Sequence, residues 1–183
     1  MRIIDEQRGT VNLNQAREIF ENSVLALNSD CVIVEGATRE YSRCFVFFYQ
    51  SKKFIDTGDV RAMLGGNGPV FVNREDGRVF ETGSAFPVCH YVKAFEACSD
   101  PLGQLTEKVK IFSLNPGANR VRAIQSVKEK SEMGLSQAKT VIDNVQENGA
   151  SYFTALTVEY AEQAVVALKE SGFDSVQLWS NQC

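Results

Sequence analysis

Histidine is nearly absent from this sequence, since His90 is the only one among 183 residues. General acid–base catalysis near neutral pH most often uses histidine, so the sequence lacks the most common catalytic side chain. Cys89 and Cys98 lie close to His90, but adjacent helical residues point about 100° apart and no further ligand follows at a metal-site spacing. We therefore expect no metal site, no cofactor and no catalytic residues. A nucleophilic pair of His90 with Cys31 or Cys44 stays open, although small thiols packed inside strands are the favoured interpretation.

The sequence also lacks long apolar runs, a regular cysteine framework and an excess of basic residues. No run reaches the roughly 18 residues of a membrane-spanning helix, and Asp5 and Glu6 interrupt the beginning before a signal peptide could form. The 5 cysteines are odd in number and irregularly spaced, which favours free thiols in a reducing compartment. The net charge of −4 supplies no field that attracts nucleic acid or an anionic membrane. These absences favour a cytoplasmic protein with neither a nucleic-acid nor a membrane partner.

What the sequence does contain is enough apolar residues for a sizeable core, since 44% of them are hydrophobic. A chain of this length forms one large domain or two small ones. The periodicity breaks in residues 99–104, a polar stretch whose Pro101 cannot continue a helix. We therefore expect two domains, residues 1–100 and residues 106–183.

The first of these domains shows helix and hairpin patterns in turn. Asn12, with Gln15 three residues later, predicts a helix cap. The expected elements are a helix over 13–27, strands over 31–34, 44–49, 70–72 and 79–81 that form two hairpins, and a helix over 88–98. The glycine-rich residues 65–69 precede a strand and lack the Lys-Ser/Thr pair of a phosphate-binding loop, so we expect a turn there. These patterns predict an α+β domain with antiparallel hairpins and flanking helices.

Aromatic side chains on both faces of one predicted strand allow two interpretations. The run from Phe45 to Tyr49 alternates its side chains between the two faces of a sheet, and both faces then carry aromatic residues. Either the helices over 13–27 and 88–98 cover the two faces, or one face is exposed and docks another protein.

The second domain is expected to have the element order β-α-α-β-α-β. The expected elements are strands at 109–114, 152–157 and 175–179, and helices over 120–130, from Ser136 to about Val145, and over 161–168. Together with the first domain, this order predicts an α+β fold class for the whole chain.

Several motifs of the first domain occur in the order seen in a known family. They are Phe45-Val46-Phe47-Phe48-Tyr49-Gln50-Ser51-Lys52, then Thr57-Gly58-Asp59, then Gly65-Gly66-Asn67-Gly68-Pro69-Val70 and the Asp76-Gly77 turn. Residues 10–98 thereby resemble immunity protein family thirty-five. Its members are small α+β domains, encoded beside polymorphic bacterial toxins, that bind and silence their cognate toxin. The resemblance implies an antitoxin that acts by binding a cognate protein toxin and not by catalysis.

The second domain resembles the C-terminal domain of the bacterial ribosomal stalk protein over residues 108–179. The resemblance rests on Gly117-Ala118-Asn119-Arg120-Val121, Gly134-Leu135 with Ala138-Lys139, and Ala161-Glu162 leading to the run from Ala167 to Gly172. In that family the first two helices form a face that recruits translational GTPases such as elongation factors Tu and G.

The stalk resemblance implies a partner-binding face at particular positions of this chain. These positions are Arg120, Val121, Ile124, Gln125, Lys128, Gly134, Leu135 and Lys139. Gln125 stands where the family usually has lysine, and Glu129 and Glu132 add negative charge nearby. Alternatively, the three large apolar residues of this set belong mostly to the core. We expect an immunity protein whose toxin acts on translation, with a translation-associated adaptor that binds a translational GTPase as the alternative.

Overall fold

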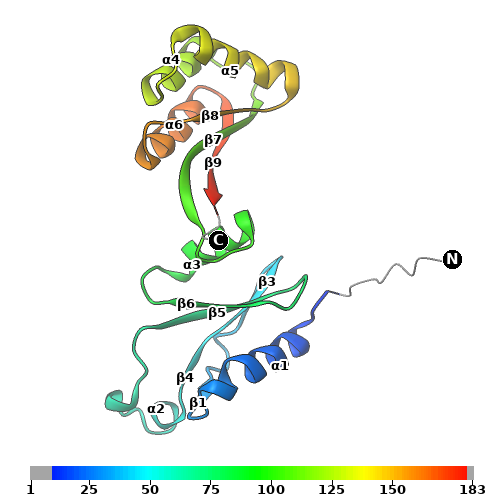
Figure 1. The fold of residues 1–183 in the computed structure, drawn as a ribbon, viewed down its shortest axis with the longest axis vertical. Coiled ribbons are helices and arrows are strands. Elements are labelled where there is room, and N and C mark those ends of the chain that lie inside the picture. The colour runs from blue at the N-terminus through cyan, green and yellow to red at the C-terminus, as the bar shows by residue number, and fades with distance from the viewer. Residues whose placement is uncertain (1–9, 181–183) are drawn as a thin grey trace, which may run out of the picture. The chain divides into compact units, whose positions relative to one another are not determined.

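The chain divides between Gly103 and Gln104 into two units in the computed structural model, which describes residues 10–180. This division falls in the polar segment where the sequence predicted a domain boundary, and independent folding of each unit stays a prediction. Unit 1 precedes the division and unit 2 follows it (Figure 1). No helix within residues 10–180 has the length and apolar character needed to cross a lipid bilayer.

Unit 1 opens with helix α1 (Leu13–Ser23), which begins at a capping box. The side chain of Asn12 accepts a hydrogen bond from the backbone N–H of Gln15, and the side chain of Gln15 accepts one from the N–H of Asn12, at 3.0 and 2.9 Å. These reciprocal bonds satisfy two amides at the start of the helix, as the sequence predicted. The helix ends earlier than predicted, and a short 3-10 helix, η1 (Leu25–Leu27), follows it.

Six strands of unit 1 form two separate antiparallel sheets. Strands β2 (Arg39–Glu40), β3 (Cys44–Phe47), β5 (Asn67–Asn73) and β6 (Val79–Gly83) form one sheet in the order β2-β3-β5-β6, and β1 (Cys31–Ile33) pairs with β4 (Tyr49–Ser51). The predicted second hairpin is β5 and β6. The predicted first hairpin is wrong in part, because the aromatic run is divided at Phe48 and its two halves pair with different partners.

Strand β3 is covered on both faces. Phe45 and Phe47 pack into the cluster under α1, and the rings of Phe47 and Phe20 stack with their centroids 5.1 Å apart. Cys44 and Val46 point the other way, into the cluster under α3 (Val88–Cys98). Helices α1 and α3 accordingly lie on opposite sides of the four-stranded sheet (Figure 1). The interpretation with two covering helices is therefore right, and the exposed docking face is wrong for this strand.

The connection between β4 and β5 contains two short helices that the sequence patterns did not predict. They are α2 (Lys52–Thr57) and the 3-10 helix η2 (Val60–Ala62). The glycine-rich residues after them are partly absorbed into β5, where Gly68 lies against the β6 backbone: a Cβ there would come within 2.1 Å of the carbonyl oxygen of Gly83.

Unit 2 has the predicted element order β-α-α-β-α-β. Its elements are β7 (Gln104–Leu114), α4 (Arg120–Lys130), α5 (Leu135–Asn148), β8 (Ser151–Thr154), α6 (Val158–Glu170) and β9 (Phe173–Ser180). The strands form an antiparallel sheet in the order β8-β7-β9, with β7 longer than predicted. Side chains such as Val109 and Ile111 of β7 and Phe153 of β8 form one core with the three helices. Both units therefore have the α+β architecture expected from the sequence.

Candidate functional site

The metal-ligating side chains that the structure describes do not gather into a metal site. Among residues 10–180, no group of three or more His, Cys, Asp or Glu side chains is placed to hold a metal ion. The ring of His90 stacks on Phe86, with the ring centroids 4.4 Å apart. Burial raises the pKa of the Cys44 thiol to about 12, and burial also raises the pKa of Cys31. Both thiols therefore lack the thiolate character that a cysteine nucleophile needs near neutral pH.

The face predicted from the stalk resemblance lies on the antiparallel pair α4–α5. Arg120, at the start of α4, forms an ion pair with Asp143 and donates a hydrogen bond to Gln146, both near the end of α5. The Lys139 ammonium lies 4.0 Å from the same Asp143 carboxylate. Because one carboxylate is shared by both cations, the positive charge that this face offers a partner is partly compensated within unit 2.

All eight residues of the predicted face lie on α4, on α5 or at the cap of α5, and they differ in exposure. Gln125, Lys128 and Gly134 are exposed. Val121 and Leu135 are 69% and 61% exposed, so they are not core residues, whereas Ile124 packs partly against the core of unit 2.

The two exposed apolar residues of this face are far from one another. Val121 follows Arg120 at the start of α4, and Leu135 begins α5 beyond the other end of α4. A helix of 11 residues is about 16 Å long. Val121 and Leu135 therefore belong to opposite ends of the helix pair and do not form one apolar patch.

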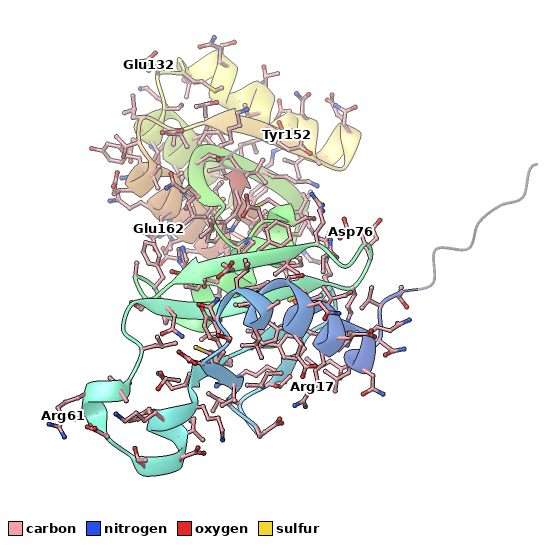
Figure 2. The ribbon with its side chains drawn as sticks, turned by 60° about the horizontal axis from the view of Figure 1, so that its bottom comes forward. Arg17, Arg61, Asp76, Glu132, Tyr152 and Glu162 are labelled. Carbon is pink, nitrogen blue, oxygen red and sulfur yellow. The ribbon has the colours of Figure 1, made fainter. Side chains whose placement is uncertain are left out.

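A second candidate surface lies in unit 1, where residues 52–66 leave the sheet between β4 and β5. Side chains next to this segment fasten its two ends. The Ser51 hydroxyl accepts a hydrogen bond from the N–H of Phe54 at 3.1 Å and donates one to the carbonyl of Ala62. The Gln50 amide accepts a hydrogen bond from the N–H of Leu64 at 2.6 Å and donates one to the Leu64 carbonyl at 3.3 Å. Figure 2 shows Arg61 at the outer tip of the segment, pointing away from the sheet.

Four large aliphatic side chains are exposed on this part of unit 1, which we call the α2–η2 surface. They are Leu27 from η1, Ile55 from α2, Val60 from η2 and Met63 just after η2, exposed by 82%, 47%, 72% and 51%. The segments that carry them meet at one end of the β1–β4 pair, where the N–H of Lys52 donates a hydrogen bond of 2.8 Å to the Asp30 carbonyl.

Two hollows flank helix α2 on this surface. The larger, of about 650 Å³, is bordered by Asp30, Lys52 and Ala62 among others. The smaller, of about 350 Å³, is bordered by Ile55 together with Leu25 and Val32. The α2–η2 surface is therefore an uneven one, with apolar projections and recesses that a complementary protein could fill.

The charges of the same segment are largely paired with one another. Lys52 and Asp56 form an ion pair of 2.9 Å, and Arg61 and Asp59 form one of 3.1 Å. Exposed pairs of this kind add little stability, and they reduce the field that the surface projects into solvent. The binding chemistry that this surface offers is thus mainly apolar.

The comparison with family models concerns unit 1. Residues 14–95 match the family model of Immunity protein 35. The chain is also 28% identical to the uncharacterized protein YrhB of Escherichia coli strain K12 over 69 residues, which cover 38% of this chain and 73% of that relative. No solved structure matches the chain. The match confirms the predicted resemblance for the first half, while the stalk resemblance of residues 108–179 stays a prediction.

The Immunity protein 35 match contains the α2–η2 surface and excludes the α4–α5 face. The sequence patterns predict no helix or strand within residues 52–64, because the apolar residues there follow neither a helical nor a strand period. Two cap residues could have indicated the short helices: Ser51 caps α2, and Asp59 caps η2 by accepting a hydrogen bond from the N–H of Arg61.

Proposed function

We propose that this chain is an immunity protein, which binds a cognate polymorphic bacterial toxin and neutralises it stoichiometrically, without catalysis. The match of residues 14–95 to Immunity protein 35 is the observation that carries this proposal. The surfaces of unit 1 and unit 2 support it by offering exposed apolar side chains on structured segments.

Stoichiometric neutralisation sets a requirement on the complex. An antitoxin must hold its toxin at low cellular concentration, which calls for a Kd near the nanomolar range, about −12 kcal/mol. Stable and specific protein–protein interfaces typically bury about 800 Å² on each partner. A single exposed side chain cannot supply such an area, so the docking surface must combine several elements of the fold.

A titration with the toxin encoded by the neighbouring reading frame tests this function. Toxin activity should fall linearly with added protein and reach zero near a molar ratio of one, and the two chains should elute as one complex from a sizing column. Suppression at a small fraction of one equivalent would instead indicate that the protein acts as an enzyme on the toxin or its product. If the protein neither binds nor inhibits this toxin, the immunity function is wrong.

A finer proposal is that unit 2 has a stalk-like fold and that the toxin acts on translation. It is favoured by the exposed Val121 and Leu135 and by Lys128, which has no ion-pair partner within residues 10–180. The same observations support the alternative function, an adaptor that binds a translational GTPase. Asp143 counts against both, because it compensates Arg120 and Lys139.

Charge reversal of the α4–α5 face tests the role of unit 2. The triple variant Arg120→Glu, Lys128→Glu and Lys139→Glu should weaken binding to elongation factor Tu or to the toxin by at least about tenfold at low salt, and less at physiological salt, where exposed charges are screened over about 8 Å. A triple reversal at Lys108, Lys110 and Lys169 changes the net charge equally and serves as control. Equal affinities of the two variants would show that the α4–α5 face has no part in binding.

A further inference from the structure

The connection that carries the α2–η2 surface is longer and more ordered than its place in the fold requires. It runs for fifteen residues between the end of β4 at Ser51 and the start of β5 at Asn67. Most connections in compact domains have about four to six residues, and structured long ones usually have a function. Neither α2 nor η2 contains a buried residue, so the segment does not contribute a helix to the core.

Hydrogen bonds, not core packing, give this connection its shape. Besides the bonds from Gln50 and Ser51 at its ends, the Thr57 hydroxyl donates to the Lys53 carbonyl at 2.6 Å and accepts from the N–H of Asp59 at 3.2 Å. The Asp59 carboxylate in turn accepts from the N–H of Arg61 at 3.1 Å. This network holds Ile55 and Val60 in fixed, solvent-exposed positions, although folding gains little from exposing them.

We propose that the toxin docks on the α2–η2 surface, with Leu27, Ile55, Val60 and Met63 as the apolar anchors of the interface. This inference rests on the proposed immunity function and names the surface that performs it. The anchors come from three segments that meet at one end of the β1–β4 pair, and apolar surface of this kind at the centre of an interface supplies most of its binding energy. The hollow of about 650 Å³ beside α2 accepts a projecting side chain of the toxin.

The charges around the anchors identify the occupant as a protein with an apolar, nearly neutral patch. Lys52 and Arg61 are paired with Asp56 and Asp59, and the charge of Lys53 is balanced by Asp30, which borders the same hollow. The surface therefore has no excess charge that would attract a strongly basic or acidic partner. A surface without excess positive charge offers an anionic lipid surface no electrostatic attraction. A protein partner instead removes the aliphatic side chains from water and leaves the paired charges at the rim.

Two exposed valines provide a matched test. Val60 on the α2–η2 surface and Val166 on α6 are 72% and 54% exposed, so glutamate at either position creates no buried charge. Val60→Glu should weaken toxin binding by about 30-fold or more, the loss expected at an interface hot spot, and Met63→Glu should act in the same direction. Val166→Glu, which lies outside both candidate surfaces, should leave the affinity within about twofold. Thermal unfolding of each full-length variant verifies that it is folded.

The outcomes separate this inference from the function on which it rests. If the unsubstituted protein does not bind the toxin, the immunity function fails; if it binds and Val60→Glu binds equally well, only the docking surface is wrong. A dimer that Val60→Glu dissociates would assign the surface to a second copy. Binding to phosphatidylserine vesicles that Val60→Glu abolishes would assign it to a membrane.

Discussion

Gly68 shows at the scale of a residue how the glycine-rich segment determines the path of the chain. It is buried in β5, and any Cβ at this position would overlap the backbone of Gly83 across the ladder to β6. The neighbouring Asn67 side chain donates a hydrogen bond of 2.9 Å to the carbonyl of Tyr49. Close approach of two backbones, and not phosphate binding, is therefore the structural reason for glycine here.

Gly68→Ala should lower the free energy of unfolding by about 1–3 kcal/mol or more, because the methyl group forces β5 and β6 apart. Gly65→Ala is the matched control: a Cβ there meets no atom within 4 Å, so the change should stay within about 0.5 kcal/mol. Urea denaturation followed by circular dichroism measures both. Equal stability of the two variants would mean that the strands can separate without cost.

The buried thiol of Cys44 makes stability depend on alkaline pH. Burial raises its pKa to about 12, whereas the unfolded thiol ionises around the usual 9.0. Between these pH values the unfolded chain releases a proton that the folded chain retains. The contribution of the Cys44 thiol to the free energy of unfolding is therefore complete below pH 9 and is lost as the pH rises toward 12. Cys44→Ala should flatten the fall in unfolding free energy above pH 9, and Cys89→Ala, which removes an exposed thiol, should not. If the unfolding free energies of both variants fall with equal slopes above pH 9, the buried Cys44 thiol is not the cause of the alkaline loss of stability.

Helix α1 illustrates at the scale of an element how much a local motif predicts. Its first residue, its capping box and its buried positions Ala16 and Phe20 all follow from the spacing of Asn12, Gln15 and the apolar residues. Asn12→Ala should destabilise unit 1 by about 1 kcal/mol, because it leaves N-terminal amides of the helix without a partner.

Asn22 provides the comparison for Asn12 within the same helix. It is exposed inside α1 and does not cap it, so Asn22→Ala should be neutral or slightly stabilising, since alanine has the higher helix propensity. Thermal unfolding of both variants measures the difference. A loss of stability at Asn22 as large as at Asn12 would rule out capping as the cause.

Other elements could not be predicted from local sequence, because contacts with distant parts of the chain determine where they begin and end. The aromatic run is locally one strand, and only the separate pairing of β1 with Tyr49 and of β5 with Phe47 divides it at Phe48. The bounds of α3 were predicted because its apolar stripe has a regular helical period. Helix α2 has no such stripe, and its start is marked instead by the hydrogen bond that the Ser51 hydroxyl accepts from the N–H of Phe54. The α2–η2 surface was missed for the same reason.

The whole molecule consists of two units, and the segment that connects them is short. Leu102 is exposed, whereas its neighbours Pro101 and Gly103 are buried, and β7 begins directly afterwards at Gln104. The sequence predicted a face on α4 and α5 whose residues are exposed except Ile124, and the part of this face in binding stays a prediction. It could not foresee the compensation of Arg120 by Asp143, because that contact depends on how the two helices pack.

Chymotrypsin, which cuts after large apolar residues, should cleave the native chain after Leu102 and release two fragments that resist further digestion. The physical reason is that each unit has its own core and that Leu102 is the exposed apolar residue in the segment between them. Leu102→Thr should slow this cleavage without altering thermal unfolding. Mass spectrometry identifies the fragments, and digestion of either unit to small peptides would show that it does not fold alone.

Because β3 lies between β2 and β5 and beneath helices on both faces, its backbone amides are shielded in every direction. The amide hydrogens of Phe45 and Val46 can reach deuterated water only when the helices and the neighbouring strands separate together. Their hydrogen-exchange rates therefore report the complete opening of unit 1. Measured in the native protein, these rates give its global unfolding free energy without denaturant, and a toxin that binds unit 1 should slow them in proportion to its affinity.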